Sequence, residues 1–278
     1  MLWSMAHLQE LLAARYAGQP APTLPPADTN AVLQTLLSHR SVRAFAPDAL
    51  PDGTLELLVA AAQSAPSSSN LQVWSLIAVQ DPARKQRLSL LAGDQVHIRE
   101  APLFLAFLVD TARLSDLAAR AGGPAEGLEF LDTFLMGAID AALAAQNALV
   151  AAESLGLGTV YIGALRNRPE EVAQELGLTP GLFAVFGLCV GRPDPARPAA
   201  VKPRLAQENV LFHEQYQRRT GRPDVSDYDA AMRTFYESQR QPVVDWSQHS
   251  LERVRGPEAL RGRDRLRAAL SALGFPLR

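Results

Sequence analysis

Four short apolar runs stand out along the chain, and longer polar or amphipathic segments separate them. They are almost continuously hydrophobic rather than alternating, which is typical of strands covered on both faces of a sheet. The predicted strands are VWSLIAVQ (73–80), LFLAFLVD (103–110), TVYIGAL (159–165) and LFAVFGLCVG (182–191). Segments with helical spacing lie between them, so the pattern predicts a layered α+β fold.

The longest helical pattern covers residues 127–155 and ends at Gly156 and Gly158. It carries no charge between Asp140 and Glu153, so we expect a central helix that is buried all round. A helix that begins at residue 54 is expected to take Thr54 as its N-cap. That helix is predicted over 54–65, and further helices are predicted over 6–17, 30–40, 226–239 and 257–274.

Proline-rich stretches mark the expected domain organisation. QPAPTLPPADT (19–29) predicts a linker, which separates an N-terminal extension, residues 1–28, from one folded domain, residues 29–278. GRPDPARPAAVKPRL (191–205) predicts an extended surface segment. The polar helices beyond it have too few apolar residues to close a core of their own, so we expect them to be peripheral arms.

Composition excludes several classes of function. The net charge of −2 and the pI near 6.2 provide no basic field for nucleic acid or an anionic membrane. The single cysteine, Cys189, excludes an internal disulfide and is expected to be a small buried hydrophobe. The five histidines are scattered without metal-ligand spacing, so no metal is expected. With no signal peptide pattern and no apolar run of membrane-spanning length, we expect a cytoplasmic protein.

The familiar motifs of other enzyme classes are missing from the sequence. It has neither the G-x-S-x-G turn of serine hydrolases nor a P-loop. GLGTVYIG begins with G-x-G, but its third glycine is misplaced and a strand follows, which disfavours a Rossmann dinucleotide site. We find no convincing acid–base pair among the carboxylates.

Four polar clusters at element boundaries are the remaining candidates for chemistry: HRSVR (39–43), SAPSSSN (64–70), TVYIGALRN (159–167) and VKPRL (201–205). Each has an ordinary interpretation as a helix end, a capping loop, a tight turn or a solvated charge. Arginine clusters carry little weight here, because all but two of the 27 basic residues are arginine. Arginine, lysine and serine side chains can, however, grip a phosphate by charge-assisted hydrogen bonds.

Taken in order, these clusters resemble the FMN-dependent nitroreductases. The likeness is closest to the major oxygen-insensitive NADPH nitroreductases and NADPH:flavin oxidoreductases, and it runs from about residue 30 to at least 216. AAESLGLGTVYIGALRN is its most specific part. The resemblance implies a three-layer fold with a mixed central sheet, helices on both faces, and a homodimer with FMN at the interface.

The resemblance also implies a set of cofactor contacts. The N-terminal motif would hold the FMN phosphate and ribityl chain and bring a basic group to the pyrimidine end: His39, Arg40, Ser41 and Arg43. The serine loop would contact the cofactor from the other subunit: Ser67, Ser68 and Ser69. Gln95 would bond the edge of the ring. The segment along the ring near N5 would be Tyr161, Ile162, Gly163 and Ala164. Lys202 and Arg204 would close on the phosphate.

Three departures from the family pattern accompany these matches. Ala164 stands where close relatives have glycine, and Asn70 stands where an aromatic residue is frequent. Pro242, Val243 and Val244 replace the arginine pair thought to meet the NADPH 2′-phosphate, and the nearest basic residue is Arg240. The preference between NADPH and NADH is therefore left open, as are the physiological acceptor and the role of the extension.

The activity implied is hydride transfer from NADPH or NADH, through flavin N5, to nitroaromatics, quinones or similar small-molecule two-electron acceptors, by a ping-pong mechanism. Because the flavin is the reactive centre, no catalytic side chain is expected. Two alternatives stay open at this point. One is an NAD(P)H:flavin reductase that supplies free reduced flavin, and the other is a flavin-binding redox sensor without turnover.

Overall fold

The computed structural model describes residues 5–17, 19, 30–216 and 224–278. The chain divides into two compact units. Unit 1 combines residues 1–40 with 199–259, and unit 2 combines residues 41–198 with 260–278. The predicted linker lies, except for Gln19, outside the described residues, so the boundary after residue 28 stays a prediction.

Unit 2 is built on the four strands that the apolar runs predicted: β1 (Trp74–Val79), β2 (Leu103–Asp110), β3 (Gly158–Ile162) and β4 (Leu182–Gly191). Their order in the sheet is β1-β2-β4-β3, and all three pairings are antiparallel. The expectation of a mixed sheet is therefore wrong for the named strands. Among the described residues, parallel pairing is limited to a single bridge between Ser41 and Thr159.

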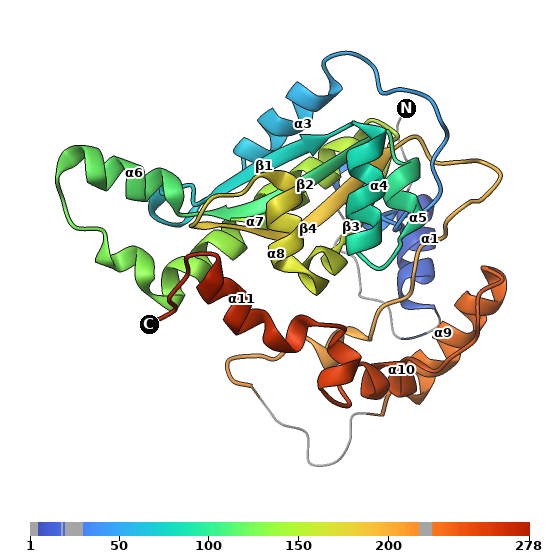
Figure 1. The fold of residues 1–278 in the computed structure, drawn as a ribbon. Helices are drawn as coiled ribbons and strands as arrows, with labels where there is room; N and C mark the ends of the chain where they lie inside the picture. The colour runs from blue at the N-terminus through green and yellow to red at the C-terminus, as the bar shows by residue number, and fades with distance from the viewer. Residues whose placement is uncertain (1–4, 18, 20–29, 217–223) are drawn as a thin grey trace. The chain divides into compact units, whose positions relative to one another are not determined.

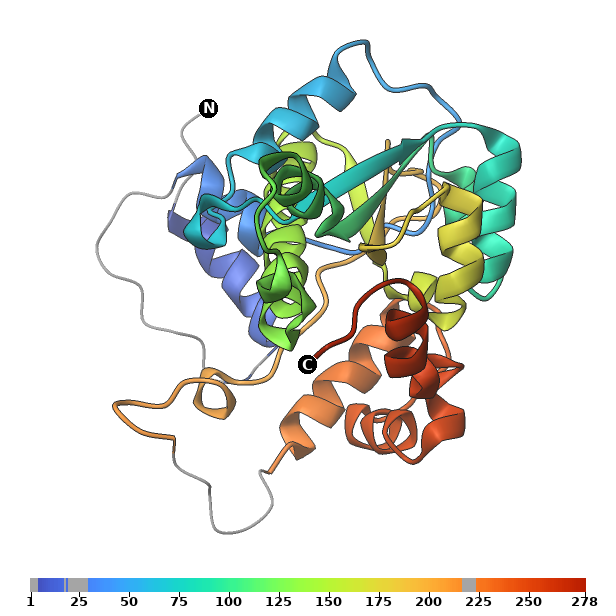
Figure 2. The ribbon, with the colours of Figure 1, turned by 60° about the vertical axis from the view of Figure 1, so that its left-hand side comes forward.

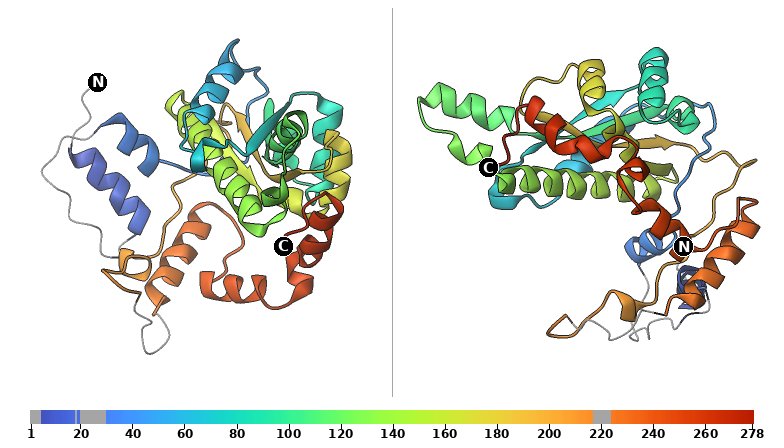
Figure 3. Two further views of the ribbon diagram at one scale, coloured as in Figure 1. Left: turned by 90° about the vertical axis from the view of Figure 1, so that its left-hand side faces the viewer. Right: turned by 60° about the horizontal axis from the view of Figure 1, so that its bottom comes forward.

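Helices cover both faces of this sheet, as its near-continuous apolar strands predicted. Helices α3 (Thr54–Gln63) and α7 (Leu131–Ser154) lie side by side on one face (Figures 1 and 2). On the other face lie α4 (Pro82–Leu91), α5 (Val96–Glu100) and α8 (Pro169–Leu176), as Figure 3 shows. Every residue of β2 is buried.

Helix α7 forms the main core contact with the sheet. Ala144 and Ala148 of α7 pack with Leu105 and Phe107 of β2, and all four are almost fully buried. The helix comes so close that a Cβ atom at Gly137 would lie 2.7 Å from the side chain of Val109. Small residues at this contact therefore let α7 approach the sheet directly.

The expectation that α7 is buried all round is wrong. Four residues spaced four apart form an exposed apolar face, each between 39% and 57% exposed: Leu131, Leu135, Ile139 and Leu143. We call these four residues the α7 stripe. By length and composition α7 could also cross a membrane, but the same holds for core helices, and its opposite side packs on the sheet.

The remaining helices of unit 2 lie at its margins. Helix α6 (Ala112–Ala121) follows β2, and α11 (Leu266–Ala272) packs Leu270 against Phe183 at the start of β4. The predicted helix over 257–274 is broken, because 3-10 turns occupy Pro257–Leu260 and Arg263–Arg265. At α3, Gly53 takes the N-cap position with φ +79°, and the hydroxyl of Thr54 instead donates to the carbonyl of Pro51.

Unit 1 contains α1 (Met5–Tyr16), α2 (Ala31–Leu37), α9 (Ser226–Ser238) and α10 (Trp246–Arg253). The stretch 192–206, which leads from β4 into this unit, has no helix or strand, but a turn at residues 195–197 interrupts the segment that was predicted to be extended. The buried hydroxyl of Tyr228 on α9 donates to the carbonyl of Pro203 at 3.1 Å. This bond fixes the extended segment between the two predicted phosphate contacts, Lys202 and Arg204.

Candidate cofactor site

The N-terminal motif lies beside the first residues of β3, although more than 110 residues separate them in the chain. Ser41 forms the parallel bridge to Thr159, and the N–H of Val42 donates to the Thr159 carbonyl at 2.8 Å. Val42 is buried on Gly158, where a Cβ atom would lie 2.7 Å from it. Because side chains alternate along an extended chain, Ser41 and Arg43 face away from that contact.

Strand β3 ends in the segment that the sequence placed along the flavin ring. Ile162 and Ala164 are buried, whereas Tyr161 is 37% exposed. A 3-10 turn begins at Gly163, so the predicted strand is three residues too long. A Cβ atom at Gly163 would lie 3.3 Å from the guanidinium of Arg166, which in turn donates to the carbonyl of Val185. Gly163 therefore leaves its backbone without a side chain beside Arg166, whereas the methyl group of Ala164 is buried.

Tyr161 is held in place by two neighbours. Its ring packs edge-on against Phe186, with 5.2 Å between centroids, and its hydroxyl donates to Oε1 of Gln146 on α7 over 3.4 Å. Burial, with Glu153 nearby, raises the pKa of Tyr161 well above its ordinary value. The hydroxyl therefore stays protonated and remains a hydrogen-bond donor at physiological pH.

Gln95 lies at the start of α5, on a loop that borders the 3-10 turn. Its carbonyl accepts from Ser89 Oγ at 2.9 Å, and a Cβ atom added to Gly93, two residues earlier, would lie 3.9 Å from the side chain of Asn167 at the end of that turn. Burial, helped by the positive charge of Arg43, lowers the pKa of His97 to about 4. His97 is therefore neutral at pH 7, whereas Arg43 provides a positive charge near it.

The serine loop is organised by a buried carboxylate on α7. Asp140, only 1% exposed, accepts from the Ser67 hydroxyl at 3.0 Å, the Ser68 N–H at 3.1 Å and the Val73 N–H at 3.1 Å. Three donors make the carboxylate a strong anchor, since hydrogen bonds to charged groups stabilise more than neutral ones. Sequence reasoning missed this role, and the available signal was a lone acidic residue inside an apolar helix.

The outer part of the same loop faces solvent. Ser68 and Ser69 are exposed, and Ser69, Asn70 and Gln72 all have left-handed φ values near +50°. This loop leads into β1, whereas Tyr161 belongs to β3 at the opposite edge of the sheet. Three strand spacings put the two edges about 14 Å apart. Within one chain, therefore, the strand that follows the serine loop lies across the sheet from the strand that carries Tyr161.

The other predicted phosphate contacts belong to unit 1. The ammonium of Lys202 lies 5.5 Å from the ring centroid of Phe235 and 5.4 Å from that of Tyr236, which is cation–π range. Arg204 is exposed, and both line a cavity of about 620 Å³ with aromatic walls that include Tyr228 and Trp246. His39 and Arg40 follow the end of α2 in this unit, with His39 half-buried and Arg40 exposed.

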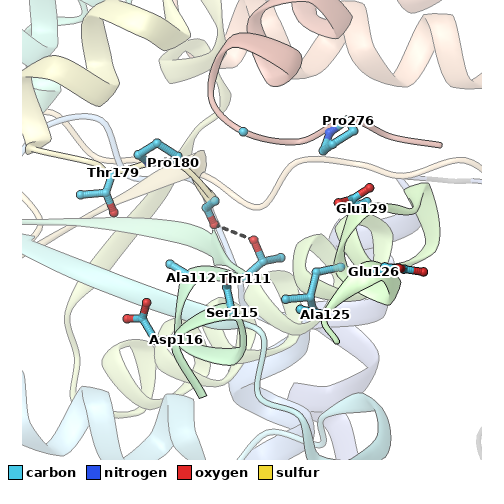
Figure 4. A pocket seen from close by; sticks show the side chains of 13 residues that line it. Thr111, Ala112, Ser115, Asp116, Ala125, Glu126, Glu129, Thr179, Pro180 and Pro276 are labelled. Atoms are coloured by element: carbon cyan, nitrogen blue, oxygen red, sulfur yellow. Dashed lines mark hydrogen bonds between the residues drawn. The ribbon is translucent and has the colours of Figure 1, made fainter. Parts of the chain in front are cut away.

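A second cavity, of about 710 Å³, lies in unit 2 near the first residues of α6 and β4 (Figure 4). Its acidic lining residues are Asp116, Glu126 and Glu129, and none of the predicted cofactor residues lines it. Carboxylates repel a phosphate, so this cavity does not suit a flavin nucleotide.

The residues around β3 and those of VKPRL both suit FMN by their chemistry. The first group combines a bare backbone at Gly163, a partly exposed aromatic ring and the Arg43 cation, as a planar ring with an anionic edge requires. The second group provides Lys202 and Arg204 beside a cavity, as a phosphate requires.

Cys189 is fully buried, as expected, and burial raises the pKa of its thiol. Within the described residues no cluster of metal-ligating side chains occurs.

Comparison with known proteins bears directly on this chemistry. The Nitroreductase family model matches residues 36–192, and the model of the Nitroreductase family C-terminal domain matches residues 202–278. The NADPH-flavin oxidoreductase of Vibrio harveyi is 37% identical over 229 residues, which cover 82% of this chain and 92% of that protein. The oxygen-insensitive NADPH nitroreductase of Salmonella typhimurium is 40% identical over 185 residues, 66% of this chain and 74% of the relative.

The fold comparison agrees with the sequence comparison. The structure of the NADPH:FMN oxidoreductase from Vibrio harveyi complexed with NAD+ superimposes with a TM-score of 0.77 at 33% identity. That match covers 90% of this chain and the whole of the other. The motifs, the fold and both family models agree, and the chain belongs to the nitroreductase family.

Proposed function

We propose that this protein is an FMN-dependent NAD(P)H oxidoreductase that reduces nitroaromatics, quinones or free flavins. FMN, when bound, supplies the two-electron chemistry, taking hydride from the nicotinamide at N5 and giving it to the acceptor. The names of its relatives, NADPH-flavin oxidoreductase and NADPH nitroreductase, support the donor and, among the acceptors, flavins and nitro compounds. The same names disfavour a sensor without turnover. Dependence on NAD(P)H also supports a cytoplasmic location.

The bridge between Ser41 and Thr159 is the observation that carries this proposal. It brings residues 41–43 of the N-terminal motif to the strand that leads through Tyr161 to Ala164, so parts of two predicted flavin-binding segments lie next to each other in unit 2. Arg43 would face the electron-rich end of the ring, while Gln95 and the backbone of Gly163 would bond its edge. Lys202 and Arg204, with His39 and Arg40, would hold the phosphate.

We also propose that the working form is a homodimer with a cofactor site at each interface. The α7 stripe exposes four apolar residues in one row, which is typical of a surface that another chain covers. The serine loop supports the same conclusion, because its exposed hydroxyls lie across the sheet from Tyr161 of the same protomer. Ser67–Ser69 would then reach the FMN of the partner subunit.

An anaerobic titration tests the proposed function directly. The purified protein should show flavin absorbance, and additions of NADPH or NADH should bleach it. Comparing the two donors measures their preference, for which the absent arginine pair at Pro242–Val244 predicts weak discrimination. A colourless protein that takes up no added FMN would refute the proposal.

Flavin reduction is the second candidate activity, and the name of the Vibrio harveyi relative favours it. Steady-state rates with free FMN and with a nitroaromatic, measured at equal donor concentration, separate the two. A kcat/KM at least tenfold higher for free FMN would identify flavin reductase as the main activity.

A further inference from the structure

The N-terminal extension places a buried arginine against both predicted phosphate-binding motifs. Arg15, near the end of α1, is only 8% exposed. Its Nη2 donates to the carbonyls of Leu37 and His39, at 2.8 and 2.9 Å. Its Nη1 donates to the carbonyl of Lys202 at 3.0 Å. One guanidinium thus joins His39, the first residue of HRSVR, to Lys202 of VKPRL, and the four residues that make these contacts belong to unit 1.

Backbone and amide contacts strengthen the same junction. The N–H of Arg204 donates to the carbonyl of Arg15 at 2.8 Å. The side-chain amide of Gln19 forms two further hydrogen bonds to this segment. Its Nε2 donates to the carbonyl of Arg204 at 2.9 Å, and its Oε1 accepts from the N–H of Ala206 at 3.0 Å. The extension therefore holds residues 202–206 at several successive positions.

The geometry of these contacts requires arginine in particular. A guanidinium is planar and offers five donors in a fixed fork, so it can serve three carbonyls that lie in different directions. Hydrogen bonds from a charged donor are stronger than those between neutral groups. A buried ammonium would satisfy fewer of these carbonyls, and an apolar side chain would leave all three without this donor.

We infer that Arg15 is a positioning residue that sets the spacing of His39 and Lys202 and thereby the affinity for the FMN phosphate. The inference rests on the proposed function, because it takes HRSVR and VKPRL as the phosphate site. It goes beyond the family relationship, since residue 15 precedes both matched segments, 36–192 and 202–278.

The test compares FMN with riboflavin, which has the same ring but no phosphate. Apoprotein of the full chain carrying Arg15→Met is titrated with each flavin, and Kd is measured from the quenching of flavin fluorescence. We expect Kd for FMN to rise about tenfold, and Kd for riboflavin to stay within about twofold. Arg15→Lys should restore only part of the FMN affinity. Arg255→Met, which removes an exposed arginine of the same unit, is the matched control and should change neither value.

Each outcome is decisive. Equal weakening of FMN and riboflavin would reduce Arg15 to a general structural role, and unchanged FMN affinity would also overturn the inference. If Arg15→Met does not fold, Gln19→Ala tests the same junction, with an expected rise of about threefold for FMN alone. If the unmodified protein binds riboflavin as tightly as FMN, the phosphate site itself is refuted, a failure of the proposed function that is visible before any variant is made.

Discussion

Near β3, the surroundings of His97 and Tyr161 determine the protonation states of these two side chains. His97 is neutral because it is partly buried and close to Arg43, and the hydroxyl of Tyr161 keeps its proton. Arg43 is exposed to solvent and stays charged. Arg43 therefore contributes a positive charge here, which favours a group that gains negative charge on reduction.

Replacing Arg43 by alanine should make the bound flavin harder to reduce. A cation in contact with a unit charge contributes at most about 4 kcal/mol at an effective dielectric constant near 20. For two electrons this corresponds to a fall in midpoint potential of at most about 90 mV, and less where water screens the pair. Spectroelectrochemistry measures it. Arg168→Ala, at an exposed residue paired with Glu171, should leave the potential unchanged, and an unchanged value for Arg43→Ala would contradict the assigned role.

His97 should make stability depend on pH in a defined window. Its pKa is about 4 in the folded protein against an ordinary value of 6.5. The unfolded chain therefore binds a proton first as the pH falls, and stability is lost between pH 6.5 and 4, by up to about 3 kcal/mol. Urea unfolding at several pH values should show this loss. His97→Gln should flatten the curve, whereas His249→Gln, at an exposed position on α10, should not.

At the scale of elements, α7 connects several parts of unit 2. One side packs on β2, Asp140 anchors the serine loop, Gln146 contacts Tyr161, and the α7 stripe faces outward. A single helix thus determines where the predicted cofactor segments at both edges of the sheet lie.

Removing the charge of Asp140 should loosen the serine loop and destabilise the fold. In Asp140→Asn, the new amide group turns a donor toward backbone N–H groups that require an acceptor, so we expect a loss of about 2–4 kcal/mol. Ser67→Ala, which removes one of the three donors, should cost about 1 kcal/mol. Denaturant unfolding at constant protein concentration measures both. Asp132→Asn, at an exposed residue of the same helix, is the control.

The hydrophobic pattern predicted the strands well because each is a buried apolar run. It overextended β3, since Gly163, Ala164 and Leu165 continue the apolar run while the backbone already turns into a 3-10 helix. The pattern also predicted that the outer face of α7 is buried, which is wrong. Apolar residues in a sequence do not indicate whether they pack against the protein's own sheet or remain exposed on its surface. Motif matching selected Ser67 and Lys202, but the residues that hold them, Asp140 and Arg15, depend on contacts distant in sequence.

At the scale of the whole molecule, the proposed homodimer would build each cofactor site from two chains. The serine loop and the Tyr161 segment lie at opposite edges of one sheet. Cofactor binding and association are then linked, because a ligand that binds only the assembled form stabilises that form.

A charge in the α7 stripe should therefore separate the subunits and release the flavin together. Ile139→Glu would bury a carboxylate in the apolar interface, which costs several kcal/mol. Sedimentation velocity should show a monomer, and the protein should lose its yellow colour on gel filtration. Leu117→Glu, at an equally exposed leucine on α6, should do neither. A dimeric, flavin-loaded Ile139→Glu protein would exclude the α7 stripe as the interface.

The single cysteine of the protein, Cys189, is fully buried in β4, so its reaction with a thiol reagent can report on unfolding. A maleimide dye cannot reach it while the central strands are paired, so labelling should proceed only through opening of the sheet. Dye incorporation with time would then count excursions from the native state directly, with no background from any other cysteine.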